Sequence, residues 1–139
     1  MSAMRLGAAT FVFVGLSHLL LLHLFAPAPT AAEAALDDHA RRTSVTVLAL
    51  TRDFLGINTA FSLEMGVMVT SFGVLVWLAA HQATRSFTVV CLLTALASLA
   101  VSAAYLVEIP IAGFAFAAAC FAYALRADKA AVPQEGVLR

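Results

Sequence analysis

Glu64 is the residue whose type and position most directly suggest chemistry, because it stands inside a long apolar segment. An ionisable side chain in a membrane-crossing helix costs about 2.5–3.5 kcal/mol on insertion scales, so it normally faces the protein interior and finds a partner. Glu64 lies about ten positions into the segment 54–83, roughly 15 Å along a helix and close to the middle of a bilayer. We expect either a ligand, proton or ion site at Glu64, or a protonated carboxyl that only hydrogen-bonds a neighbouring helix.

His18 is expected at a similar depth, roughly 12 Å from the matching end of the first apolar segment. A hydrogen bond between His18 and Glu64 is geometrically allowed and would couple the two groups strongly in a low dielectric. A lone histidine at this depth is also often only an interhelical hydrogen bonder. His23 lies about 140° around the helix from His18, so we expect the two histidines to face different surroundings and His23 to be structural.

Most polar side chains of the first three apolar segments fall in the same half of the membrane. This asymmetry predicts a polar pocket that opens outward or into the outer leaflet. Glu64 and His18 would be its acid–base pair, and a ligand would contact five further residues, although serines in membrane helices often bond only their own backbone. These predicted ligand contacts are Asn58, Phe61, Ser98, Ser102 and Tyr105.

Small residues recur along the second apolar segment at intervals of three and four. Small side chains on one helix face let a neighbouring backbone approach closely. Glu64 is about 200° around the helix from Ser62, so it should point away from this stripe. The stripe consists of Thr59, Ser62, Gly66, Thr70 and Gly73.

The composition places these residues in a membrane. Of the 139 residues, 63% are hydrophobic and 12% charged, whereas soluble domains have roughly 45–50% and 25%. Apolar segments at 6–26, 54–83, 86–107 and 109–125 are each long enough, or nearly so, to cross about 30 Å of hydrocarbon. We predict an all-α fold, a four-helix antiparallel transmembrane bundle over 1–126, with a flexible cytoplasmic tail at 127–139.

Local signals mark the ends of these segments. Pro27 and Pro29 end the first one, because proline cannot donate a backbone hydrogen bond. Pro110 stands in the first turn of the fourth, where its missing N–H costs least. The first segment also resembles a signal peptide, but its apolar core exceeds the usual 7–15 residues, so we expect it to be retained.

The loop 27–53 is the one sizeable segment outside the membrane. Thr30 and Glu33 have the spacing of a capping box, which predicts a short extra helix that ends at Arg41 and Arg42. Residues 44–53 are expected either to extend the second membrane helix or to pack at the interface. Five basic residues on the other side of the membrane outnumber the three in this loop, which predicts a plasma (inner) membrane protein with both termini cytoplasmic.

Several function classes are excluded or disfavoured. The formal net charge is zero and no basic run occurs, which argues against nucleic acid as a partner. Cys91 and Cys120 lie in apolar segments and are expected to act as small hydrophobes, so no metal site is predicted. Only one histidine is deep, so we expect no haem and no other cofactor.

The layout of four short spans, a long first loop and the segment Phe61-Ser62-Leu63-Glu64-Met65-Gly66 resembles small bacterial four-helix membrane proteins. More loosely it is similar to the DoxX-like group and to the EXPERA group, which includes sterol isomerases. This resemblance implies an amphiphilic ligand held near an acidic residue in the membrane, and it assigns no catalytic residue.

Three functions remain open at this point. The first is binding of a hydrophobic or lipid-like small molecule, with non-redox isomerase or cyclase chemistry at Glu64 and His18 if the protein is an enzyme. The second is a non-catalytic accessory or assembly subunit of a larger membrane complex. The third is a proton- or ion-coupled transporter that works as a homo-oligomer.

Overall fold

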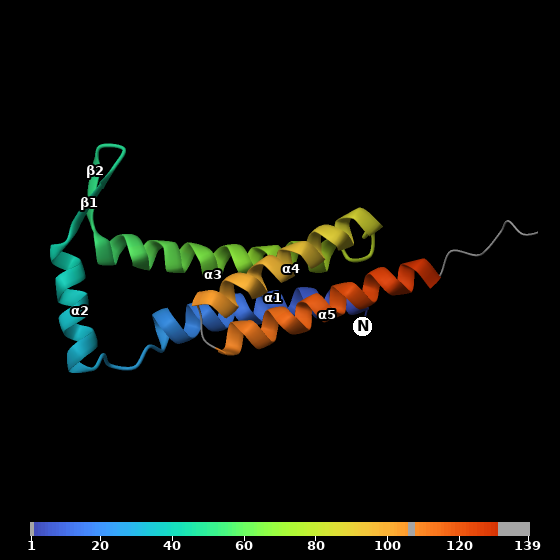
Figure 1. The fold of residues 1–139 in the computed structure, drawn as a ribbon, viewed down its shortest axis with the longest axis horizontal. Helices are drawn as coiled ribbons and strands as arrows, with labels where there is room; N and C mark the ends of the chain where they lie inside the picture. The colour runs from blue at the N-terminus through green and yellow to red at the C-terminus, as the bar shows by residue number, and fades with distance from the viewer. Residues whose placement is uncertain (1, 106–107, 131–139) are drawn as a thin grey trace, which may run out of the picture. The chain divides into compact units, whose positions relative to one another are not determined.

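The computed structural model of the chain is largely helical and describes residues 2–105 and 108–130 (Figure 1). A single two-stranded sheet interrupts the helices within these residues. In chain order the elements are α1 (Ala3–Leu19), the π-helix η1 (Leu20–Leu24), α2 (Ala31–Arg42), β1 (Ser44–Val47), β2 (Leu50–Asp53), α3 (Phe54–Ala79), α4 (Arg85–Tyr105) and α5 (Glu108–Ala130).

Four helical segments of the described residues are long and apolar enough to cross a membrane: Ala3–Leu24, Phe54–Ala79, Arg85–Ala104 and Pro110–Ala127. They correspond to the four segments predicted from the sequence, and they fit an integral membrane protein. The first begins three residues earlier and ends two residues earlier than expected, before Pro27. Helix α5 continues to Ala130, beyond the expected start of the tail, and residues 131–139 lie outside the described part.

The chain divides into two compact units, one formed by Met1–Val14 with Val69–Arg139 and the other by Gly15–Met68. The first unit has an aromatic core. The Phe11 ring lies 4.9 Å from that of Phe72 and 5.1 Å from that of Phe114, between ring centroids. Cys91 and Cys120 are buried and not disulfide-bonded, in agreement with the expectation that they pack as small hydrophobes.

Gly66 and Gly73 of the small-residue stripe on α3 contact α1, as expected of small residues that let a neighbouring helix approach. In the first unit, a Cβ atom added at Gly73 would lie 2.7 Å from the backbone nitrogen of Val12 and 2.8 Å from the backbone oxygen of Ala8. In the second unit, a Cβ atom at Gly66 would lie 2.6 Å from Leu19 Cδ2. Gly73 therefore needs to be glycine for the backbones to approach this closely, whereas at Gly66 the contact is with a side chain.

The second unit contains α2 and the β1–β2 hairpin. Helix α2 begins with the capping box predicted at Thr30: its side chain accepts from the Glu33 backbone N–H, and the Glu33 carboxylate accepts from the Thr30 backbone N–H at 2.7 Å. The Thr30 backbone N–H, and to a lesser extent the Thr30 side chain, lower the pKa of Glu33 from its usual range, because hydrogen bonds to the carboxylate favour its ionised form.

Residues 44–53 form an antiparallel hairpin, and the expectation that they extend the second membrane helix is wrong. Val45 pairs with Arg52 and Val47 with Leu50. Leu48 and Ala49 make the two-residue turn with φ of 48° and 66°. Such a turn requires positive φ at both positions and normally carries Asn or Gly. Leu48 and Ala49 are neither, so the sequence lacks the usual signal of a hairpin turn.

Candidate functional site

Three polar side chains meet where α1 continues into η1 and packs on α3, all within Gly15–Met68. His18 Nε2 lies 3.0 Å from both the backbone oxygen and the Oγ of Ser62. His23 Nε2 lies 3.0 Å from the same Oγ. The two imidazole rings are 5.9 Å apart between centroids and meet edge to face. We call His18, His23 and Ser62 the His–Ser cluster.

The π-helix explains why His23 joins this cluster. A regular α-helix would turn His23 about 140° away from His18, which was the basis for expecting separate surroundings. The chain instead forms η1 at Leu20–Leu24, where the Phe25 N–H donates to the Leu20 carbonyl five residues earlier. A π-helical turn places residues five apart on one face, so that expectation is wrong.

Only one contact in the His–Ser cluster has a required direction. The Ser62 carbonyl can only accept, so the hydrogen bond of 3.0 Å has His18 Nε2 as the donor. The Ser62 hydroxyl can donate to His23 Nε2 or accept from it. One serine thus hydrogen-bonds both histidines.

Glu64 does not belong to the His–Ser cluster. Its side chain is exposed, and within residues 2–105 and 108–130 it forms no hydrogen bond or ion pair, with His18 or with any other residue. Glu64 lies about 200° around α3 from Ser62. Because Ser62 and Gly66 face α1, the Glu64 side chain points away from His18 and His23. Asn58 and Phe61 are exposed on α3 as well.

The remaining predicted contacts belong to the other unit. Ser102 is buried and Ser98 is half-buried on α4, and the side chain of Tyr105 lies outside the part that the structure describes. No fully buried side-chain nitrogen or oxygen in the described residues lacks a hydrogen-bond partner. The roles predicted for Glu64, His18, Asn58, Phe61, Ser98, Ser102 and Tyr105 stay predictions.

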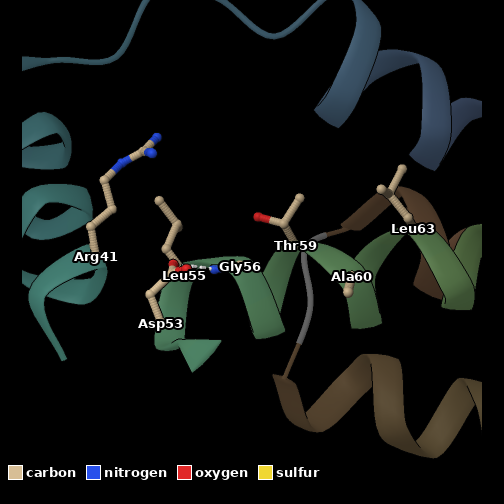
Figure 2. Close-up of a pocket in the computed structure, with 7 residues that line it drawn as sticks. All are labelled: Arg41, Asp53, Leu55, Gly56, Thr59, Ala60 and Leu63. Atoms are coloured by element: carbon tan, nitrogen blue, oxygen red, sulfur yellow. Dashed lines mark hydrogen bonds between the residues drawn. The ribbon is translucent and has the colours of Figure 1, made fainter. Parts of the chain in front are cut away.

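An open pocket of about 360 Å³ lies between α2 and the first turns of α3, in the second unit (Figure 2). Leu55, Thr59 and Leu63 recur every four residues and project to the same side of α3. The small residues Gly56 and Ala60 add little bulk between them. The complete lining is Arg41, Asp53, Leu55, Gly56, Thr59, Ala60 and Leu63. We call this the α2–α3 pocket.

The α2–α3 pocket carries one positive and one negative group, Arg41 and Asp53, at the end where α3 begins. Asp53 precedes α3, and its Oδ1 accepts from the Gly56 N–H at 2.7 Å, which is an N-terminal helix cap. Arg41 forms no hydrogen bond or ion pair within the described residues. The adjacent Arg42 is different, because it pairs with Asp38. The exposed Arg41 guanidinium therefore has no partner among the described residues.

The sequence did not predict this pocket, and of its lining on α3 only Thr59 was singled out, as a member of the small-residue stripe. Arg41 was expected only as the end of the loop helix, and Leu55 and Leu63 are ordinary apolar residues of a membrane segment. The recurrence of Leu55, Thr59 and Leu63 at intervals of four, beside Gly56 and Ala60, was a usable signal for a shallow helix face. What the sequence lacked was the position of α2 beside that face.

No known protein family, curated protein or solved structure matches this chain. Within the described residues, no group of three or more His, Cys, Asp or Glu side chains is placed to hold a metal ion. The geometry of the His–Ser cluster and of the α2–α3 pocket is therefore the basis for any functional argument.

Proposed function

We propose that this integral membrane protein binds an amphiphilic, lipid-like molecule with a phosphate-bearing head group in the α2–α3 pocket. In this proposal the four apolar helices form an antiparallel bundle, both termini are cytoplasmic, and the pocket lies in the outer half of the membrane. The observation that carries the proposal is the pocket itself, which combines an unpaired guanidinium with an apolar face at the start of a candidate membrane span.

The size of the pocket suits a small amphiphile. Ligand pockets commonly measure about 300–1,000 Å³ and are mostly apolar with a few placed polar groups, and this one measures about 360 Å³. Leu55 and Leu63 are eight residues apart, which corresponds to about 12 Å of helix. An alkyl chain can lie along this length on Leu55 and Leu63, which project to the same side of α3.

The charged end of the pocket defines the head group. Arg41 offers a planar set of donors that matches a phosphate. Asp53 retains its second carboxylate oxygen, because only Oδ1 accepts from the Gly56 N–H. One cation and one anion together favour a zwitterionic head, in which a phosphate pairs with Arg41 and an ammonium group pairs with Asp53.

The contacts favour binding over acid–base catalysis centred on Glu64. Glu64 has no hydrogen bond to His18 and does not line the pocket. Isomerase or cyclase chemistry by a Glu64–His18 pair is therefore not part of the proposal.

Native mass spectrometry after mild detergent extraction tests the proposal. Wild-type protein and the variant Arg42→Gln should retain a phospholipid, because Arg42 is paired with Asp38 and does not line the pocket. Arg41→Gln should lose most of it. Equal lipid retention in Arg41→Gln and Arg42→Gln would refute the assignment, and a bound protein in place of a lipid would favour an accessory subunit.

A further inference from the structure

A row of exposed side chains runs along the face of α3 that points away from α1. In the second unit it comprises Phe61, Glu64 and Met68, with Phe61 67% and Met68 64% exposed. The intervals of three and four residues put these three side chains on one helix face. We call Phe61, Glu64 and Met68 the outer seam of α3.

The spacing of the outer seam is that of a helix–helix interface. Alternating steps of three and four residues define the contact positions of a two-helix coil. The same spacing continues in the sequence to Ser71, Leu75 and Leu78, which are exposed too. Helix α3 therefore carries a second contact pattern in addition to the small-residue stripe that meets α1.

Glu64 distinguishes this seam from an ordinary lipid-facing surface. It is the eleventh residue of the candidate span Phe54–Ala79, about 15 Å from its start, and is therefore at the depth of the hydrocarbon. A carboxyl group there is costly unless a polar group meets it. Within the unit Gly15–Met68 no residue does so, and Glu64 is exposed, so a group from another molecule can meet it.

We infer that the outer seam of α3 docks on the outer seam of a second copy of this chain. A neutral carboxyl carries one donor and further acceptor capacity, so two such groups satisfy each other. Two copies inserted in the same direction and related by a twofold axis along the membrane normal place Glu64 opposite Glu64, at one depth. Twofold dimers have this self-complementary interface, and they are the commonest oligomers.

The remaining residues of the seam are self-complementary in the same way. Phe61 meets Phe61 and Met68 meets Met68, while a different partner protein would need its own polar group at the depth of Glu64. A polar residue in an otherwise apolar seam also fixes the register of two helices. The side of the α2–α3 pocket formed by Leu55, Thr59 and Leu63 lies about 100° or more around α3 from Glu64, whereas Ala60, which also lines the pocket, lies one turn before Glu64.

Cysteine crosslinking in native membranes tests the dimer. Met68→Cys stands on the seam, and Leu63→Cys is a matched control on another exposed part of the same helix. The wild-type protein controls for Cys91 and Cys120, which are buried. With copper–phenanthroline as oxidant, Met68→Cys should give a disulfide-linked band of twice the chain mass, and Leu63→Cys and the wild type should not.

A second measurement isolates the contribution of Glu64. In detergent, Glu64→Leu should weaken dimerisation roughly tenfold, the change expected for loss of an interhelical hydrogen bond. Glu64→Gln should retain the dimer, because an amide also donates and accepts. The inference is overturned if Met68→Cys stays monomeric, links to a different protein, or links no more than Leu63→Cys, or if Glu64→Leu dimerises like the wild type.

Discussion

Replacing Gly73 by alanine should separate α1 from α3 and destabilise the protein. The added methyl group would lie 2.7 Å from the Val12 backbone nitrogen and 2.8 Å from the Ala8 backbone oxygen, well inside the contact distance of about 3.5–4.0 Å. Backbone atoms cannot rotate away, so the helices themselves must move. Overpacking typically costs about 1–3 kcal/mol, and alanine returns up to about 1 kcal/mol of helix propensity.

Because the Gly73→Ala methyl group meets two backbone atoms, we expect an overpacking cost of about 2–3 kcal/mol. With about 1 kcal/mol regained in helix propensity, the net loss in the free energy of unfolding is about 1–2 kcal/mol. Gly66→Ala is the comparison variant, because its methyl group would meet side-chain atoms only, Leu19 Cδ2 at 2.6 Å, Leu19 Cγ at 2.7 Å and His18 Cδ2 at 3.1 Å. Side chains can shift where a backbone cannot, so Gly66→Ala should lose less stability than Gly73→Ala. Unfolding in mixed detergent micelles, followed by circular dichroism, measures both. A Gly73→Ala protein as stable as the wild type would refute the close approach of the helices.

Three further predictions concern the second unit. Ser62→Ala removes the hydroxyl that hydrogen-bonds His23, so the contact between η1 and α3 should weaken by about 0.6 kcal/mol. The ¹⁵N NMR signals of the His23 ring should shift, and unchanged signals would contradict the hydrogen bond. The pKa of Glu33 is lowered in the folded state, so the contribution of its ionised carboxyl to α2 is present above the usual glutamate range and is lost as the pH falls through the lowered value. Amide exchange in α2 should accelerate over that acidic interval in the wild type but not in Glu33→Gln, and equal acceleration in both would argue against the capping box. Ala49→Gly relieves a positive φ of 66° and should slow amide exchange in the hairpin by stabilising it by about 1 kcal/mol; faster exchange would contradict the turn geometry.

The membrane spans, the capping box and the stripe on α3 were predictable because each depends on local sequence. Continuous apolar segments, the Thr30–Glu33 spacing and the recurrence of small residues at three and four report directly on helix geometry. The burial of Cys91 and Cys120 followed from their apolar surroundings for the same reason.

The His–Ser cluster was not predictable, because a helical wheel assumes one constant turn per residue. Nothing in the leucine-rich segment before Phe25 signals a π-helix, and that one irregular turn moves His23 onto the face of His18. The hairpin was missed because Leu48 and Ala49 occupy a turn that usually carries Asn or Gly, although Val45, Thr46 and Thr51 are residues typical of strands. The α2–α3 pocket depends on a tertiary contact that no local pattern encodes.

The most direct test of the proposed function is a titration of the purified protein with dioctanoyl phosphatidylethanolamine, a short-chain zwitterionic amphiphile. The dissociation constant should rise roughly tenfold in Arg41→Gln, the lower end for a charge-assisted hydrogen bond because this guanidinium is exposed, and should be unchanged in Arg42→Gln. Dioctanoylglycerol, which lacks the charged head, should bind all three proteins equally weakly. A dissociation constant for the phospholipid that is the same in wild type, Arg41→Gln and Arg42→Gln would contradict the proposed site.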